Sequence, residues 1–143
     1  MHNLLRVSDA VSLAFHTLWL LAEREHEFLR TPEIAKLLSV SEHHLQKVHQ
    51  RLTKAGFIRA VRGPKGGFTL NRPAEEITLM QIYEAIDGPL ETTHCMLGRS
   101  TCRVKHCRLS ELVKEVNHVV RRHFEKITLA DLAKSELANS LKN

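Results

Sequence analysis

Three cysteines lie within one short window of the chain, at Cys95, Cys102 and Cys107. Because their number is odd, they cannot all pair in a disulfide framework. Thiolates are ligands for both iron and zinc, and cysteines clustered in a protein of a reducing compartment more often form a metal site or a redox sensor. We therefore predict a metal or redox site in this window.

The spacing of the cysteines narrows the kind of site. Neither interval is the C-x2-C of common zinc fingers, which makes zinc less favoured without excluding it, and neither is the C-x-x-C of dithiol oxidoreductases. Residues 90–108 show no sustained apolar period, so a loop is expected, in which several sulfurs can converge. Three thiolates leave one coordination position, for which His94, His106, Ser110 and a distant carboxylate are candidates.

A second stretch with recognisable chemistry spans residues 41–70. Ser41 is expected to cap a helix that Gly56 ends in the left-handed conformation. One face of this helix is apolar, at Leu45, Val48, Leu52 and Ala55. The opposite face is polar and partly basic, with His43, His44, Gln46, Lys47, Gln50, Arg51 and Lys54. This arrangement is typical of a helix that reads DNA.

A glycine-rich hairpin follows that helix. Residues 57–62 and 68–71 alternate as strands do, and the intervening Gly-Pro-Lys-Gly-Gly is a tight tip. Arg62 and Lys65 place cations on this protrusion, which suits a DNA groove and its phosphates. A helix followed by a basic wing predicts a winged helix-turn-helix.

Other helices are expected to position the two sites. Apolar spacing predicts an amphipathic helix within residues 4–24. Thr31 is expected to cap a helix that begins at Pro32 and ends near residue 38, which completes the helix-turn-helix. Capping boxes predict two more helices, one from Thr78 with Gln81 to about residue 87 and a short one after Thr128 with Asp131.

An apolar stripe runs along residues 109–127 for about five helical turns. One domain has little free core for so long a stripe, so the helix of residues 110–126 is predicted to form a homodimer. Two-fold symmetry would place two reading heads about 34 Å apart, on successive major grooves.

The chain has 143 residues, 43% of them hydrophobic, and a net charge of +5. We expect a mostly α fold with a small β-hairpin wing: a winged helix-turn-helix in residues 1–88, a cysteine-rich loop in 89–108, and a dimerisation helix with an extension in 109–143. The basic balance favours an anionic partner such as double-stranded DNA. No apolar run approaches the ~20 residues that span a membrane, and no signal peptide is recognisable, so we expect a cytoplasmic protein without a membrane partner.

The residues RGPKGGF in the hairpin, ITLADL near the end and a three-cysteine loop before a long helix occur together. In this combination the chain resembles, over essentially its whole length, the family of winged-helix regulators that includes IscR and the nitric-oxide sensor NsrR. The resemblance implies a homodimeric transcription regulator that holds an iron-sulfur cluster (2Fe-2S or 4Fe-4S) in each subunit's loop. The state of that cluster would alter DNA affinity.

The same resemblance implies roles for particular residues. Cys95, Cys102 and Cys107 would be the thiolate ligands. The IscR-like branch takes its fourth ligand from a histidine three residues after the last cysteine, a position held here by Ser110. The NsrR-like branch uses an aspartate at the start of the partner's first helix, which corresponds to Asp9, and this branch is therefore preferred.

The resemblance also divides the candidate DNA contacts by role. Residues expected at base edges or in the minor groove are His43, Gln46, Lys47 and Arg62. Arg51, Lys54 and Lys65 are expected at phosphates. Ser41 and His44, at the start of the helix that carries Arg51, are further candidate DNA contacts. Two alternatives stay open: a cluster-free thiol-switch or zinc-containing regulator, and a winged-helix protein-interaction module. An enzyme is not expected, because no nucleophile-base pair or phosphate loop is recognisable.

Overall fold

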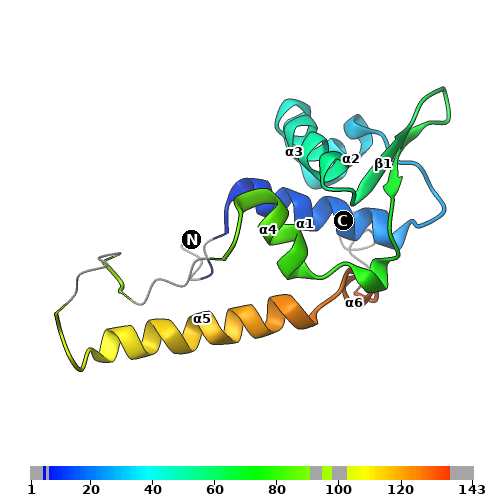
Figure 1. Cartoon of the computed structure of the whole chain (residues 1–143). Coiled ribbons are helices and arrows are strands. Elements are labelled where there is room, and N and C mark those ends of the chain that lie inside the picture. The colour runs from blue at the N-terminus through cyan, green and yellow to red at the C-terminus, as the bar shows by residue number, and fades with distance from the viewer. Residues whose placement is uncertain (1–4, 6, 91–94, 98–102, 136–143) are drawn as a thin grey trace.

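Helices make up most of the structure, a computed structural model that describes residues 5, 7–90, 95–97 and 103–135, and one hairpin projects from them (Figure 1). This confirms the predicted mostly α fold with a β-hairpin wing. The elements, in chain order, are α1 (Asp9–Glu23), α2 (Thr31–Leu38), α3 (Glu42–Lys54), β1 (Ile58–Val61), β2 (Gly67–Leu70), the 3-10 turn η1 (Ala74–Glu76), α4 (Leu79–Asp87), α5 (Arg108–Lys126) and α6 (Leu129–Ala133).

Helix α1 is the centre of the core. It packs against α2, α3, α4, α6 and the wing strand β2. Its residues Val11, Leu18 and Leu21 are completely buried, as are Leu45 and Leu52 of α3. Because burial of apolar side chains is the main stabilising term in folding, α1 holds the helix-turn-helix and the wing in one body.

The starts of the first two helices agree unequally with the sequence expectation. The Ser8 hydroxyl accepts a hydrogen bond from the Val11 N–H at 3.1 Å, and α1 begins at Asp9, inside the predicted range of residues 4–24. The predicted cap at Thr31 is wrong. The helix already begins at Thr31, with Arg30 as the capping residue, because the Glu33 carboxylate accepts the Arg30 backbone N–H at 2.7 Å.

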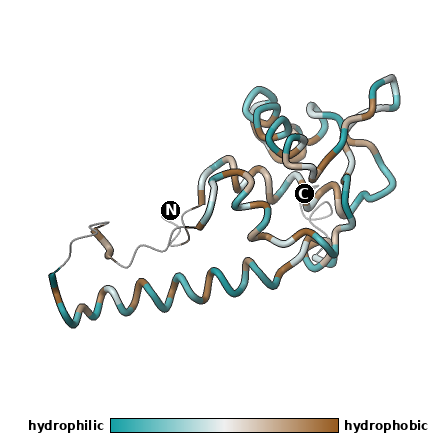
Figure 2. The backbone as a smooth tube through the Cα atoms, viewed as in Figure 1, coloured by the Kyte–Doolittle hydropathy of each residue, from teal (hydrophilic) through white to brown (hydrophobic). Residues whose placement is uncertain are grey.

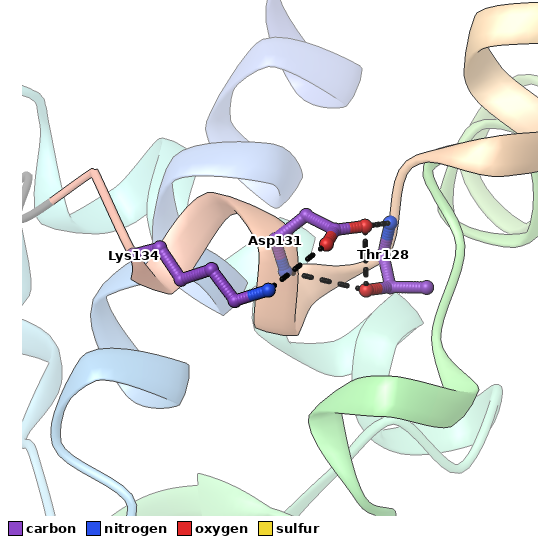
Figure 3. Close-up of polar contacts among 3 residues, drawn as sticks. All are labelled: Thr128, Asp131 and Lys134. Carbon is purple, nitrogen blue, oxygen red and sulfur yellow. Dashed lines mark hydrogen bonds and ion pairs between the residues drawn. The ribbon is translucent and has the colours of Figure 1, made fainter.

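The last helix confirms its predicted capping box (Figure 3). The Thr128 hydroxyl accepts the Asp131 N–H at 3.3 Å, and the Asp131 carboxylate accepts the Thr128 N–H at 3.0 Å. These bonds, with Lys134 nearby, hold the pKa of Asp131 below its usual value. Two backbone hydrogen bonds then join the starts of α4 and α6: the Leu79 N–H donates to the Ile127 carbonyl at 3.0 Å, and the Leu129 N–H donates to the Ile77 carbonyl at 2.9 Å.

The wing is a two-stranded antiparallel hairpin with Ile58 opposite Leu70 and Val61 opposite Gly67. Leu29 adds a third, short edge, because it exchanges two backbone hydrogen bonds with Phe68, of 3.0 and 2.8 Å. The wing is therefore bound to the chain that enters α2 as well as to its own two strands.

Gly66 is expected to be essential for the shape of the wing. A Cβ atom there would lie 2.0 Å from the backbone oxygen of Val61, which cannot move without opening the hairpin. Gly66→Ala should therefore cost about 1–3 kcal/mol of unfolding free energy and weaken DNA binding. Thermal melts and fluorescence anisotropy with duplex DNA would measure both. Pro64→Ala, at the exposed tip, is the control, and equal behaviour of the two variants would contradict the prediction.

Helix α5 extends well beyond the rest of the fold (Figure 1). Only its C-terminal part joins the core, where the Phe124 ring lies 5.7 Å from that of Phe15 and 5.9 Å from that of Tyr83. Toward its start, apolar residues recur along the helix (Figure 2). Those that stay exposed are Leu109, Leu112, Val116 and Val119.

Candidate DNA-binding surface and cysteine loop

Helix α3 presents the candidate DNA-reading side chains. As predicted, the Ser41 hydroxyl caps it, accepting the His44 N–H at 3.4 Å. The other candidate residues on this helix are exposed along one side: His43, His44, Gln46, Lys47, Gln50, Arg51 and Lys54. The structure thus brings together on one helix all the contacts that the sequence proposes for it.

The buried side of α3 holds a residue that the sequence analysis missed. His49 is 2% exposed, whereas Ala55, expected in the core, is exposed. The His49 Nδ1 atom lies 3.2 Å from the Thr31 hydroxyl, and its ring centroid lies 4.6 Å from that of Phe68. Burial lowers the pKa of His49 to about 4. This neutral imidazole therefore joins α2, α3 and the wing.

Arg62 and Lys65, the predicted wing cations, are exposed at the tip of the hairpin. A residue outside the hairpin holds its tip, because the Arg30 guanidinium donates a hydrogen bond to the Pro64 carbonyl. The Arg59 guanidinium also lies over the Phe28 ring, 5.8 Å from its centroid. Both contacts come from the segment before α2, so that segment sets where the wing cations lie relative to α3.

A groove of about 570 Å³ separates α3 from the wing. It is lined by Thr31, Gln46, His49, Gln50, Thr53, Lys54 and Phe68. Amides and one ammonium group form its α3 side, while Phe68 forms its wing side. Such a mixture of hydrogen-bonding groups beside a cation suits a nucleic-acid backbone that passes between a recognition helix and a wing.

Arg51 behaves differently from the other cations of α3. Its guanidinium Nη1 donates a hydrogen bond of 3.3 Å to the backbone carbonyl of Ile86, at the end of α4. From the sequence, Arg51 is expected to contact a DNA phosphate. In the structure the side chain joins two helices of its own subunit.

The cysteine loop lies between α4 and α5, and the structure describes two of its cysteines. Cys95 and Cys107 are half-buried, whereas Cys102 lies outside the described residues. Within residues 5, 7–90, 95–97 and 103–135, no group of three or more His, Cys, Asp or Glu side chains converges as a metal site would. Cys107 is the N-cap residue of α5. The positive end of a helix dipole stabilises negative charge, such as that of a thiolate-bound cluster.

Asp9, the candidate fourth ligand, is exposed in the first turn of α1. It lines a cavity of about 360 Å³ together with Ser12, Leu13, Val40, Ser41 and His44. The start of α1 therefore adjoins the start of α3. The first turn of α5, by contrast, lies at the far end of that helix from the body of the fold (Figure 1).

These features define a class of protein: a DNA-binding regulator with a winged helix-turn-helix. A capped recognition helix, a basic wing and a groove between them lie on one body. The chain belongs to the Rrf2 family, whose profile, described as an iron-dependent transcriptional regulator, matches residues 7–135. The prediction that the protein is a transcription regulator and not an enzyme is thereby confirmed.

Two relatives are similar to the chain in sequence, and a solved structure shares its fold. The chain is 32% identical over 133 residues to protein aau3 of Rhizobium meliloti, which covers 92% of this chain and 86% of that protein. It is 30% identical over 116 residues to the transcriptional regulator IscR of Cereibacter sphaeroides, 78% of this chain and 74% of that protein. The structure of CymR, the global cysteine regulator of B. subtilis, has a TM-score of 0.78 at 23% identity and covers 92% of this chain and 98% of that one.

Proposed function

We propose that the protein is a homodimeric DNA-binding regulator that senses redox state, nitric oxide or iron-sulfur supply through a cluster in the cysteine loop. The observation that carries the proposal is a three-thiol loop that leads directly into α5 of an iron-dependent regulator family. The homodimer is supported by the apolar stripe of α5, which its own subunit leaves exposed. Among the described residues no helix is long and apolar enough to cross a membrane, and we propose a cytoplasmic location.

The donor set of this chain fits an iron-sulfur cluster. Cys95, Cys102 and Cys107 supply the thiolates that such clusters take, and Cys107 sits at the positive end of α5. We assign the fourth position to Asp9 of the partner subunit, as in the NsrR-like branch. An oxygen ligand binds iron less strongly than a thiolate does, which suits a site that must respond to a signal. When bound, the cluster would supply a centre that reacts with oxidants or nitric oxide.

In DNA binding, we propose that His43, Gln46 and Lys47 read base edges in the major groove while Arg62 enters the minor groove. Lys54 and Lys65 contact phosphates from either side of the groove between α3 and the wing. Two such surfaces in a dimer would read the two halves of an operator.

Protein purified without oxygen should show broad visible absorption from sulfur-to-iron charge transfer, with iron and sulfide in stoichiometric amounts. Cys107→Ala should abolish these bands, and Asp9→Ala should speed their loss in air. Visible and electron paramagnetic resonance spectra with metal analysis would check both. Ser110→Ala is the matched control, since the proposal gives Ser110 no ligand role. A colourless wild-type protein that contains zinc or no metal after reconstitution would contradict the proposal.

The second candidate is a cluster-free thiol regulator. It is favoured by the close structural likeness to CymR, which is described as a cysteine regulator. In that case an oxidant would change DNA affinity in protein that contains no iron, and mass spectrometry would find the cysteines modified. A winged-helix module that has lost DNA binding would show no footprint under either condition.

A further inference from the structure

The C-terminal end of α4 is bonded to two elements that matter for DNA reading. The Ile86 carbonyl accepts the hydrogen bond from Arg51 on α3, at 3.3 Å. The neighbouring Asp87 carboxylate accepts a hydrogen bond from the Ser8 hydroxyl, at 3.0 Å, and Ser8 is the cap of α1. Two consecutive residues therefore bond the start of α1 and the last turn of α3.

The same segment leads into the cysteine loop. Gly88 ends α4 with a positive φ of 83°, and the Leu90 carbonyl accepts a hydrogen bond of 3.0 Å from Arg121 on α5. Cys95 follows five residues after Leu90. We call residues 86–90 the exit segment. On the N-terminal side of the cysteine loop, a shift of the loop backbone reaches the winged helix-turn-helix along the covalent chain through this segment.

Two directional contacts add to the packing that orients α3. Burial of Leu45 and Leu52 fixes which face of the helix meets the core, and on that face His49 contacts the Thr31 hydroxyl at 3.2 Å. The bond from Arg51 to Ile86 is directional, because strength depends on the donor angle. His44 shares this side of the helix and lines the cavity beside Asp9. The side of α3 that carries Arg51 is thus the side that adjoins α1 and α4.

We propose that Arg51 is a positioning residue that transmits the state of the cysteine loop to the DNA-reading helix through its bond to the Ile86 carbonyl. The proposal rests on the cluster-dependent function proposed above. A shift of the exit segment would move the Ile86 carbonyl, and Arg51 would carry α3 and its reading side chains with it. Lys54, on the wing side of α3, has no part in this path.

The test compares Arg51→Met with Lys54→Met, each prepared with and without the cluster by anaerobic reconstitution with ferrous iron and sulfide. Methionine keeps the apolar stem of either side chain and removes its charge and donors. Affinity for one operator duplex is measured by fluorescence anisotropy at several salt concentrations. Hydrogen exchange of the α3 amides without DNA gives a readout that does not depend on DNA contacts.

In the wild type, the cluster should change both the affinity for the operator duplex and the hydrogen exchange of the α3 amides. In Arg51→Met the affinity ratio between the two forms should fall to within about twofold of unity, with the visible spectrum and iron content unchanged. Lys54→Met should keep the wild-type ratio, while the slope of log affinity against log salt falls by about 1.8, which is about 0.9 for each of the two subunits of the dimer. Arg51→Lys keeps the cation. It should lose the wild-type affinity ratio between the two forms and keep the wild-type salt slope. This variant replaces Arg51→Met in the test if Arg51→Met does not fold.

A full wild-type ratio in Arg51→Met, together with a salt slope reduced like that of Lys54→Met, would overturn the proposal and make Arg51 a phosphate contact. Absence of any cluster effect in the wild type is a different result, because it would refute the cluster-dependent function itself. The two failures are therefore distinguishable in one experiment.

Discussion

Replacing Leu112 and Val116 together with glutamate should leave the protein monomeric at micromolar concentration. These side chains are 49% and 51% exposed in the single subunit, in the middle of the apolar stripe of α5. In a dimer they would be buried against the same stripe of the partner, and burying unpaired carboxylates there is strongly unfavourable. Size-exclusion chromatography with light scattering measures the outcome directly.

DNA affinity should fall in the same variant. Two linked reading heads gain about 10²–10⁴ in affinity over one head, provided that both reach their half-sites. We expect a loss of at least about a hundredfold on an operator with two half-sites and a much smaller loss on one half-site. Lys114→Gln with His118→Glu is the matched control, because it changes the charge of α5 equally at exposed positions outside the stripe. A dimeric glutamate variant, or a monomeric control, would contradict the assignment of the interface.

The sequence predicted the fold because most of its signals are local. Ser41, Thr78 and Thr128 each accept the backbone N–H three residues on, as their spacing indicated. The hairpin was similarly evident from five consecutive tip residues. The failures concern longer-range competition: Thr31 was expected to cap α2, but its hydroxyl lies beside His49 instead.

Contacts between distant residues were beyond any local pattern. Arg51 reaches a carbonyl 35 residues away, and Arg30 reaches one 34 residues away, so neither bond has a periodic signature. His49 could have been found. With Leu45, Val48 and Leu52 it completes the spacing of a buried helix face, but the sequence interpretation assigned this histidine to neither face. The proposed loop ligands would involve a cofactor and a partner subunit, neither of which leaves a spacing rule in one chain.

His49 should make the stability of the fold depend on acid. Its pKa is lowered from 6.5 to about 4, because burial penalises the charged ring. Between these values the unfolded chain binds a proton that the folded chain does not, so stability falls as pH falls. The contribution of the neutral His49 to the free energy of unfolding is complete above about pH 6.5 and is lost progressively towards pH 4. A shift of this size corresponds to a loss on the order of 3 kcal/mol.

A single stability curve of the wild type would not isolate the contribution of His49. His49→Gln supplies the comparison, since its amide does not titrate and can still bond the Thr31 hydroxyl. Urea unfolding at a series of pH values should show the wild type losing its advantage over this variant as pH falls from 7 to 4. Parallel curves for the two proteins would show that the buried ring contributes nothing to acid sensitivity.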